Sequence, residues 1–598
     1  MKINLKYLRE SVKLAWRSSP SLTLANIISV FLRSFLPLLL IWLIKEVIDV
    51  ITETARSSSG NIHDILWLLI ILVIIWFFDE ASADLGNYIR KKQSVKLEAY
   101  MYRLLHDKAV KLDLEYFEQP EYFDLLSRAS RDAPWRPNSI LNNLTGMLRS
   151  LMSLAIMGGL LVFLHWTIAL LLLAVNIPAV WMRIHYADIL YNVRREQTSE
   201  ERKAAYFNWL LTGGRPSREL RLFGLGNYFI SLFRKSFLKT KYEELQIIRR
   251  RTRIEMISGF VKAAAVFVTL IVVSGETIKG TLTLGQMAMF LLAFRQGMVA
   301  IRELLGSVSG LYEDTLFISD TFEFLALREK IIPVSPEADL EVFNESISAE
   351  NISYSYPGNN VKAVDGITFK INKGEIIAVV GPNGAGKSTL AKLLTRLYDP
   401  DSGTFFMDGQ DIKHFSPDEY RKLFSVVFQD FMLYNLSAGE NIRLGSIESP
   451  DSEEKIIASA STAGIDDLIK DLPKGYATVI GNLFDDSRDL SWGEWQKIAL
   501  ARALFRDAPV LILDEPSSAL DADTEYEIFS RFREIVRGRT SILISHRFSN
   551  VSLADRIIVL DRGKIVETGS HDELINKKGL YYKMYSKQTA RFLNEKQI

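Results

Sequence analysis

Six long apolar runs fill the first half of the sequence and limit what the chain can fold into. They lie at residues 22–48, 62–84, 138–163, 167–185, 254–276 and 285–307, and the third and fourth are joined only by a turn at His165 and Trp166. A helix needs about 20 apolar residues to cross a hydrocarbon layer of about 30 Å, and runs of that length are rare in soluble cores. The second half has no such run. We therefore predict an all-α transmembrane domain of six spans at residues 21–325.

The connections between the runs differ in charge, and this predicts their orientation. Lys and Arg concentrate before residue 21, between residues 86 and 137, and between residues 186 and 252, whereas the other connections are short and nearly neutral. Basic connections remain on the cytoplasmic side of a membrane. We expect a multi-pass protein of the bacterial cytoplasmic membrane with its long connections in the cytoplasm. Residues 1–20 are expected to form an interfacial helix, the alternative being a soluble cap.

Both long cytoplasmic connections have a helical pattern that is interrupted near the middle, at residues 115–124 and 213–223. Pro120 lies in the first interruption, and Gly213, Gly214 and Pro216 lie in the second. Gly and Pro end helices and reverse the chain. Each interruption is expected to hold a short transverse helix that presses on a partner domain, although an ordinary hairpin tip has the same pattern.

The composition narrows the remaining classes of protein. A chain of 598 residues exceeds a single core, so two large domains are expected. Its 72 basic and 71 acidic residues leave no net field to attract nucleic acid, and the absence of cysteine excludes disulfides and thiol chemistry. After residue 340, short β-branched runs alternate with helical ones. They predict an α/β domain at residues 345–585, after a linker at 326–344 and before a tail at 586–598.

A phosphate-binding loop follows a predicted strand at Ile376 to Val380. It comprises Gly381, Pro382, Asn383, Gly384, Ala385, Gly386, Lys387, Ser388 and Thr389, and a helix follows it. In this motif the backbone N–H groups cradle phosphates at a helix N-terminus. Lys387 would neutralise phosphate charge, and the Ser388 hydroxyl would bind Mg²⁺. The loop predicts that the chain binds ATP with Mg²⁺.

Two carboxylates follow a second predicted strand, which ends at Leu513. A carboxylate at such a strand end supports Mg²⁺ in phosphoryl-transfer sites, and Asp514 is placed for that role. Glu515 is then left to orient or deprotonate the attacking water. An isolated Asp-Glu pair is usually an ordinary strand end, but the phosphate-binding loop makes catalysis the better interpretation.

Residues 345–585 resemble the ATPase domain of the ABC transporter family, because further motifs of that family follow in order. These are Tyr356 before Pro357, Gln429, the signature stretch Leu490 to Glu494, the stretch Ser518 to Asp521, and His546 after Ser545. The resemblance implies that Tyr356 stacks on adenine, that Gln429 joins Ser388 and Asp514 around Mg²⁺, and that His546 touches the γ-phosphate. It also implies that Asp521 lies at a dimer seam.

The signature stretch implies a dimer, because in the family it binds the ATP held by the opposite subunit. Here it comprises Ser491, Gly493 and Glu494, with Trp492 where the family usually has glycine. Since every motif is present in this chain, we expect a homodimer rather than a heterodimer. If the site needs a glycine backbone, Trp492 would be strained and hydrolysis slowed. The run Glu494, Trp495, Gln496 also resembles peptide and bacteriocin exporters.

The fusion of a membrane half with an ATPase half resembles the ABC exporters, and it implies outward transport of an amphipathic peptide, drug or lipid by alternating access. A lipid flippase acting between leaflets, or a regulatory or channel-like ABC protein without uphill transport, would have the same motifs. Four cations lie within the predicted spans: Arg33, Lys262, Arg295 and Arg302. Such charges usually face a cavity or a partner. We expect a basic cavity for a cargo with a carboxylate or phosphate, the alternatives being pairing with Asp79, Glu80 or Glu255, or side chains that reach to the membrane interface.

Overall fold

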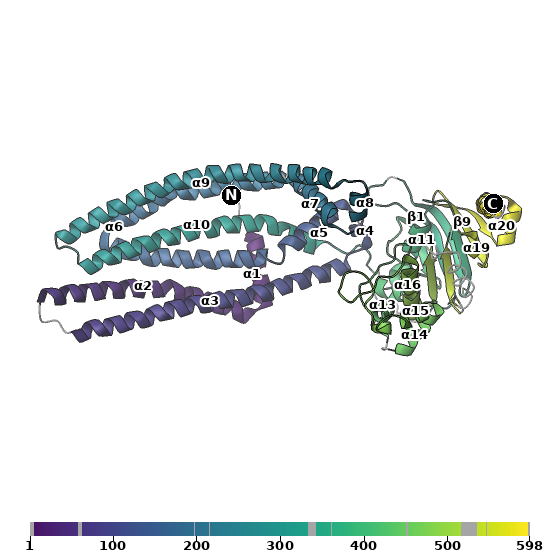
Figure 1. Ribbon diagram of the computed structural model, residues 1–598, viewed down its shortest axis with the longest axis horizontal. Coiled ribbons are helices and arrows are strands. Elements are labelled where there is room, and N and C mark those ends of the chain that lie inside the picture. The colour runs from purple at the N-terminus through teal and green to yellow at the C-terminus, as the bar shows by residue number, and fades with distance from the viewer. Residues whose placement is uncertain are drawn as a thin grey trace. The chain divides into compact units, whose positions relative to one another are not determined.

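The computed structural model describes ten stretches of the chain: residues 5–57, 62–196, 198–214, 216–332, 343–359, 361–449, 452–515, 535–536, 538–545 and 547–595. The chain divides into two compact units, drawn in Figure 1. We call residues 1–111 with 123–327 the helical unit, and residues 112–122 with 328–598 the α/β unit. The predicted fold class, a helical membrane domain followed by an α/β domain, is confirmed.

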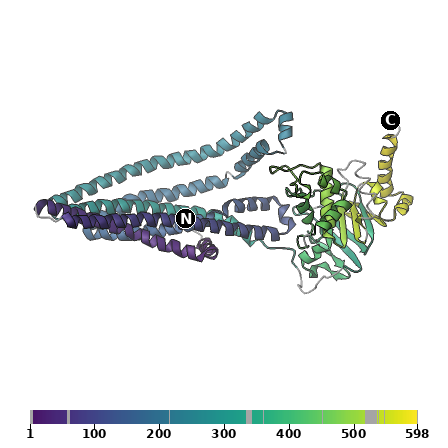
Figure 2. The ribbon, with the colours of Figure 1, turned by 60° about the horizontal axis from the view of Figure 1, so that its bottom comes forward.

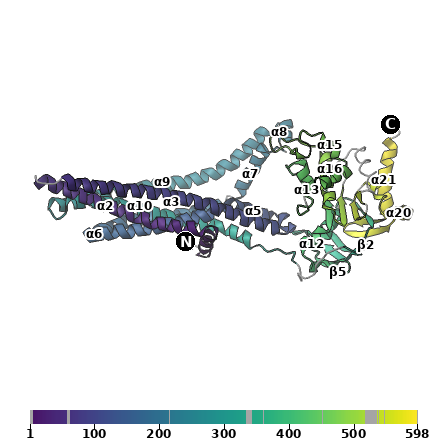
Figure 3. The ribbon, with the colours of Figure 1, turned by 90° about the horizontal axis from the view of Figure 1, so that it is seen from below.

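Helices make up the helical unit, and most of them are long. They are α1 (Leu5–Ser18), α2 (Pro20–Ser57), α3 (Ile62–Lys111), α5 (Pro120–Asp132), α6 (Arg136–Glu196), α7 (Thr198–Thr212), α8 (Ser217–Leu222), α9 (Gly226–Ile278) and α10 (Leu284–Ala326). Figures 2 and 3 show α7 and α9 diverging from α2 and α3 towards the end at which α8 lies. The short helix α4 (Leu114–Phe117) belongs to the α/β unit.

Five helices are long and apolar enough to cross a membrane, within the part of the chain that the structure describes: Pro20–Arg56, Ile62–Lys111, Arg136–Val162, Gly226–Ile278 and Leu284–Ala326. The predicted fourth span, residues 167–185, lies within α6 and stays a prediction. Helix α6 runs through the predicted turn at His165 and Trp166, but it doubles back: Arg149 lies 2.6 Å from Glu303 of α10, and Met182 lines a cavity with Arg302 of the same helix. A straight helix would separate residues 149 and 182 by about 50 Å. The chain therefore reverses within α6, in the region where the turn is predicted.

A buried ionic network joins the start of α6 to α10. The Arg136 guanidinium donates to Asp314 at 2.7 Å, and Asn143 donates to the other Asp314 oxygen at 2.9 Å. The guanidinium also lies 4.0 Å from the Trp135 ring centroid and 4.5 Å from that of Phe317. The side chains of Arg136 and Asp314 are only 8% and 3% exposed, and Arg136 also lies 3.5 Å from buried Asp132, so these three charges stabilise one another.

Two sheets form the α/β unit. The first is antiparallel, with the order β2-β1-β4-β5, and contains β1 (Ser346–Tyr354), β2 (Val364–Asn372), β4 (Ser402–Met407) and β5 (Gln410–Asp411). The second has the order β10-β9-β3-β8-β7-β6, and contains β3 (Ile376–Val380), β6 (Phe424–Val427), β7 (Val510–Asp514), β8 (Thr540–Ile544), β9 (Arg556–Asp561) and β10 (Lys564–Gly569). All its pairings are parallel except that of β10 with β9.

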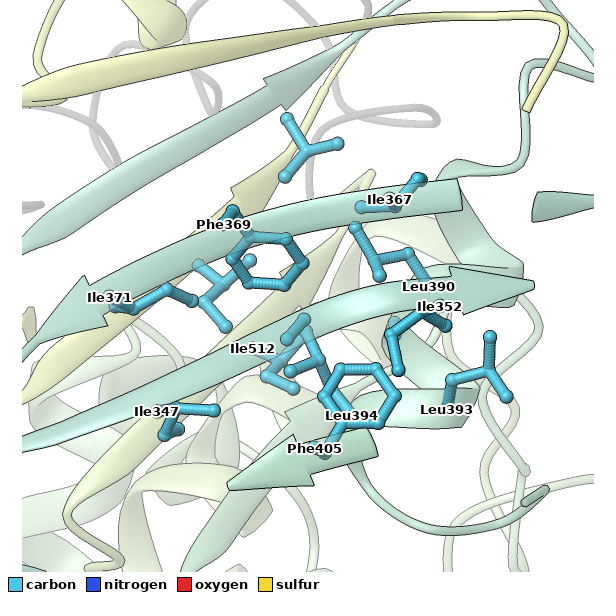
Figure 4. Packing of buried hydrophobic residues seen from close by; sticks show 14 of the residues in the cluster. Ile347, Ile352, Ile367, Phe369, Ile371, Leu390, Leu393, Leu394, Phe405 and Ile512 are labelled. Atoms are coloured by element: carbon cyan, nitrogen blue, oxygen red, sulfur yellow. The ribbon is translucent and has the colours of Figure 1, made fainter. Parts of the chain in front are cut away.

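Helices and an apolar core hold these sheets in place. The helices are α11 (Lys387–Leu394), α12 (Pro417–Lys422), α13 (Ala438–Arg443), α14 (Glu453–Thr462), α15 (Asp466–Lys470), α16 (Trp492–Arg506), α19 (Phe548–Val551), α20 (His571–Lys577) and α21 (Leu580–Glu595). Figure 4 shows side chains of both sheets and of α11 packed together, including Ile352, Leu390 and Ile512. Residues 586–595, predicted as part of a tail, instead continue α21.

The buried network predicts that Asp314→Ala strongly destabilises the helical unit. Removing one partner of a buried ion pair leaves the other charge unsolvated, and costs about 3–5 kcal/mol of unfolding free energy. Asp320→Ala is the matched control. Asp320 also lies on α10, but its ion-pair partner is Arg128 of α5, whose side chain is 40% exposed. The control should cost no more than about 1 kcal/mol. The unfolding free energies are measured by unfolding titrations in detergent. Equal losses of unfolding free energy in Asp314→Ala and Asp320→Ala would contradict the importance assigned to the network.

Candidate functional site

The phosphate-binding loop connects β3 to α11, as predicted. Gly386, immediately before α11, has φ +99°, and a Cβ atom there would lie 2.4 Å from the Ala363 carbonyl oxygen. Only glycine tolerates both the left-handed backbone and the lack of room for a Cβ atom. Lys387 is 7% exposed, and its Nζ donates to the carbonyl oxygens of Gly381 and Pro382 at 3.0 and 3.1 Å. The lysine charge is therefore held against the loop that is predicted to receive phosphates.

Burial lowers the pKa of Lys387, although Glu515 and Asp514 act in the opposite direction. These groups come together because β3 and β7 both pair in parallel with β8, so that their carboxyl ends lie at one edge of the sheet. An incoming phosphate at this edge would favour the charged lysine, because it supplies the opposite charge.

Asp514 ends β7 and is 3% exposed. Burial raises its pKa to about 6, with help from Glu515 and against the effects of Ser388 and Lys387. Its Oδ1 atom is buried and has no hydrogen-bond partner among the residues that the structure describes. A buried carboxylate oxygen beside a serine hydroxyl fits a hard cation such as Mg²⁺, which prefers oxygen ligands.

Glu515 has a backbone conformation that is uncommon for a residue with a side chain, with φ +51°. Its N–H donates to the Ile544 carbonyl on β8 at 2.8 Å, and Gln429 Nε2 donates to its Oε2 at 2.8 Å. Left-handed residues of this kind cost about 1–3 kcal/mol and cluster at functional sites. The structure therefore brings Gln429 and Glu515 together, two residues that the sequence assigns to the Mg²⁺ site and to the attacking water.

Gln496 also reaches this edge of the sheet, a contact that the sequence does not predict. From α16, its Nε2 donates to the Glu515 carbonyl oxygen at 3.4 Å. A short path thus runs from the signature helix to the backbone of the proposed catalytic carboxylate. The sequence singles out Gln496 only as part of the run Glu494 to Gln496 that resembles peptide and bacteriocin exporters.

The signature stretch begins α16 with a capping box. The Ser491 hydroxyl accepts from the Glu494 N–H at 3.3 Å, and the Glu494 carboxylate accepts from the Ser491 N–H at 2.7 Å. The N–H groups of Trp492 and Gly493 lie in the first turn, where a helix has no internal partners for them. This helix start therefore presents backbone donors, as the prediction of a second phosphate contact requires.

Trp492 is not strained, so the condition under which hydrolysis was expected to slow is not met at this residue. It is the first residue of α16 and has ordinary helical geometry, which needs no glycine. Its ring lies 4.9 Å from that of Phe431, two residues after Gln429, and the side chain is 44% exposed. The substitution thus adds an aromatic contact between the signature helix and the segment that carries Gln429.

Tyr356, predicted to stack on adenine, lies beside the phosphate-binding loop. Its hydroxyl is 3.1 Å from Thr389 Oγ1, and its ring packs edge-on against those of Tyr354 and Tyr398. Lys392 on α11 lies over this cluster, with its Nζ 5.7 Å from the centroid of the Tyr356 ring. The tyrosine is thus fixed to the helix that begins at the loop.

Lys392 also joins the first interrupted segment to this site. Its Nζ lies 3.0 Å from a carboxylate oxygen of Glu118, within the predicted coupling segment 115–124. Burial would lower the pKa of Lys392, but the Glu118 hydrogen bond and nearby anionic groups raise it overall. Lys330 pairs with Glu115 at 2.7 Å and so anchors the same segment. The sequence analysis predicted the segment but neither ion pair.

The second interrupted segment, predicted at 213–223, contains α8. Leu222 and Phe223 at its end are 78% and 65% exposed. Their apolar side chains therefore lie on the surface. A role for this segment in docking stays a prediction.

His546 and Asp521, predicted for the γ-phosphate and the dimer seam, lie outside the described residues. An unpredicted element, α21, borders the loop instead. A cavity of about 550 Å³ is lined by Gly381, Pro382 and Asn383, together with Met584 and Lys587 of α21. Gln588 accepts from the Phe548 N–H at 3.0 Å and fixes α21 beside the cavity.

The four cationic residues predicted within the spans do not all line the same cavity. Lys262 and Arg302 line one cavity of the helical unit, whereas Arg295 and Arg33 are not among its lining residues. The charged groups near Arg33 include Arg149 and Arg90 as well as Asp79. Whether these cations line a cargo cavity or pair with acidic residues stays a prediction.

The Glu118–Lys392 ion pair predicts that residues 113–119 are protected from exchange by their contact with α11. Glu118→Gln should speed hydrogen exchange of this segment about fivefold, for a half-exposed pair worth about 1 kcal/mol. The double variant Glu118→Lys with Lys392→Glu, in which the two charges are swapped, should restore protection from hydrogen exchange. Glu448→Gln is the control, because Glu448 forms its ion pair with Lys422 instead. If hydrogen exchange is as fast in this double variant as in Glu118→Gln, the contact does not depend on opposite charge.

Comparisons with known proteins match both halves of the chain. A model described as the ABC transporter transmembrane region matches residues 23–301, and one described as ABC transporter matches residues 364–518. The nisin transport ATP-binding protein NisT of Lactococcus lactis subsp. lactis is 30% identical over 562 residues, 93% of this chain and 91% of that protein. The subtilin transport ATP-binding protein SpaT of Bacillus subtilis is 29% identical over 585 residues, 97% and 94% of the two chains.

A lipid-transporting protein and a solved structure are also similar. An ATP-dependent lipid A-core flippase of Thiobacillus denitrificans is 28% identical over 527 residues, 88% of this chain and 90% of that protein. The structure of a bacterial Atm1-family ABC exporter with ATP bound has the same fold, with a TM-score of 0.79 and 24% identity over 94% of this chain and 98% of that one. This chain therefore belongs to the ABC transporter family, with its transmembrane region and its ATPase domain fused in one polypeptide.

Proposed function

We propose that this membrane protein is an exporter half-transporter, which pairs with a second copy of itself and uses ATP to move an amphipathic cargo outward across the bacterial cytoplasmic membrane. As a member of its family, the chain binds nucleotide and couples ATP hydrolysis to transport. One observation carries the proposal: Lys387, Asp514, Glu515 and Gln429 meet at one sheet edge, in a chain whose other unit has membrane-spanning helices.

The residues at the sheet edge have distinct roles in this proposal. Lys387 neutralises charge on the phosphates, and the loop N–H groups orient them. Ser388, Gln429 and Asp514 hold Mg²⁺, which when bound neutralises the charge that develops on the transferred phosphoryl group. Glu515 accepts a proton from the attacking water or orients it, and Gln429 holds the Glu515 side chain in position.

The dimer follows from the signature helix. Ser491 and Gly493 lie at the start of α16, and the proposal assigns the N–H donors of this helix start to the ATP bound by the other copy. Each copy has a complete set of motifs, so two identical sites are expected. Asp521 and His546 would complete these sites at the seam.

Coupling to the membrane relies on the two interrupted segments. The first contacts α11 through Glu118 and Lys392, so a shift of α11 on ATP binding would reach the helices that flank residues 113–122. The second offers exposed Leu222 and Phe223 for docking on the other copy. The basic connections support a cytoplasmic position of the ATPase domain in this proposal.

The cargo class has two precedents among the relatives. NisT and SpaT are named for the transport of nisin and subtilin, and a third relative is named a lipid A-core flippase. A flippase would move its cargo between leaflets with the same ATP site, and a regulatory or channel-like protein would show ATP-dependent opening without accumulation.

Glu515→Gln tests the assigned hydrolytic role. The amide retains the hydrogen-bonding shape but cannot accept a proton, so ATP hydrolysis should fall about 10²- to 10⁴-fold while ATP still binds. Hydrolysis is measured in liposomes, and binding is measured with a fluorescent ATP analogue. Glu448→Gln, an exposed position outside the site, should hydrolyse ATP at the wild-type rate. Wild-type hydrolysis by Glu515→Gln would remove Glu515 from the mechanism.

A further inference from the structure

A groove of about 580 Å³ lies between α1 and the first part of α6 in the helical unit. Leu144 of α6 lines one side of it, and the other lining residues in the described part of the chain belong to α1: Leu5, Leu8, Arg9, Val12, Lys13, Trp16 and Arg17. The side chains of Leu5 and Trp16 are 75% and 51% exposed. An apolar surface of α1 is therefore left uncovered by the described residues.

The lining residues of α1 form two parallel rows. Residues four apart lie on the same side of a helix. The apolar row is Leu8, Val12 and Trp16, and the cationic row comprises the residue that follows each of them, namely Arg9, Lys13 and Arg17. Each apolar side chain thus has a cation as its neighbour along the helix. A helix with this arrangement, and with tryptophan in its apolar row, suits the boundary between acyl chains and head groups.

Another side of α1 is fixed to the helical unit, so the groove is preformed. The Ala15 carbonyl accepts from the Thr23 hydroxyl of α2 at 3.3 Å, and the Thr23 hydroxyl accepts from Gln93 of α3 at 2.9 Å. Tyr7 stacks on Phe322 of α10, with the two ring centroids 5.3 Å apart. Because these contacts join α1 to three other helices, its two exposed rows keep a fixed direction.

The place of α1 in the chain puts the groove at the membrane surface. Only Ser19 separates α1 from α2, which is long and apolar enough to cross a membrane. Leu144 lies near the beginning of Arg136–Val162, another helix of this kind. The basic connections predict that both beginnings face the cytoplasm. The groove therefore lies where the acyl chains of the cytoplasmic leaflet meet their head groups.

The charges at the groove favour an anionic head group. Its described lining has three cations and no acidic side chain. Glu10 is the only acidic residue before residue 19, and it pairs with Lys13 at 2.6 Å. An excess of two positive charges remains even when Glu10 is counted. Arginine also suits a phosphate group, because its guanidinium can donate to two oxygens at once.

We propose that this groove binds an anionic phospholipid of the cytoplasmic leaflet, with an acyl chain along the apolar row and Leu144, and with the phosphate at Arg9 and Arg17. The inference goes beyond the proposed function, because this lipid stays in the membrane and is not the cargo. Two other outcomes are possible in the test below: α1 is a cap that faces solution, or it attracts anionic lipids only through its general charge.

The fluorescence of Trp16 tests the site in the full chain without nucleotide. The protein in phosphatidylcholine nanodiscs is titrated with brominated phosphatidylglycerol or with brominated phosphatidylcholine, since bromine quenches a tryptophan that it contacts. The chain has ten tryptophans, so the Trp16 signal is the difference between the wild type and Trp16→Phe. We expect half-maximal quenching at an about tenfold lower fraction of phosphatidylglycerol, in line with the attraction that basic residues exert on anionic lipids.

Three double variants, each measured with and without Trp16, separate a site from general charge. Arg9→Gln with Arg17→Gln should remove the preference for phosphatidylglycerol. Lys91→Gln with Lys92→Gln removes the same charge from α3 beside Gln93, outside the groove, and should keep the preference. Arg9→Glu with Arg17→Glu should instead favour a brominated lipid with a cationic head group, which a misfolded α1 would not do.

Three results would overturn the proposal. If neither lipid quenches Trp16, α1 does not face the bilayer; if both lipids quench it equally, the groove does not select anionic lipids. If the two glutamine double variants lose the preference equally, general surface charge and not the groove attracts the lipid. None of these results affects the proposed transporter, which depends on ATP hydrolysis and on Glu515.

Discussion

Charges buried at the carboxyl edge of parallel strands are the constraint on which the α/β unit depends. Lys387 and Asp514 are both more than nine-tenths buried, and burial disfavours the charged form of each. A phosphate near the lysine and a cation near the carboxylate would each reverse that penalty. The charged forms of these two side chains are therefore unfavourable in the empty site and become favourable when a phosphate and its cation are bound. The strands, the glycine loop and the left-handed backbone of Glu515 all position these groups.

The same edge is connected to more distant parts of the chain by direct contacts. Gln429 holds Glu515 from the segment that also contains Phe431, and Phe431 packs on Trp492 at the start of the signature helix. On the other side, α11 carries Lys392 to Glu118. A change at the phosphates can therefore reach both the signature helix and the first interrupted segment through packed side chains and charges, which is the physical requirement for coupling.

The sequence predicts the elements whose signals are local. Short stretches of sequence are enough to predict the loop at Gly381 to Thr389, the strand before Asp514 and the apolar helices. The signals are glycines, β-branched residues and unbroken apolar runs, respectively. Contacts between distant residues have no such signal. Glu118 and Lys392 are 274 residues apart in sequence, and neither lies in a motif that names its partner.

Two outcomes have equally physical causes. Strain at Trp492 was expected only if the site needs a glycine backbone, but a helix N-terminus accepts any side chain that can point away from the turn, and Phe431 covers this one. The reversal of α6 near His165 and Trp166 was predicted from the length of the apolar region, which is too long for one span. Likewise, the sequence could place Lys262, Arg295 and Arg302 within spans, but only packing decides which of them share a cavity.

The central claim is that ATP closes two identical copies around shared sites, and the absence of cysteine allows a direct measurement. A single cysteine introduced at the exposed Ile447, outside all the motifs, gives one spin label per copy and one distance between copies. In the Glu515→Gln background, pulsed electron paramagnetic resonance in nanodiscs should show one inter-copy distance that changes and narrows when ATP and Mg²⁺ are added. The absence of dipolar coupling, or a distribution that ATP does not change, would contradict the account.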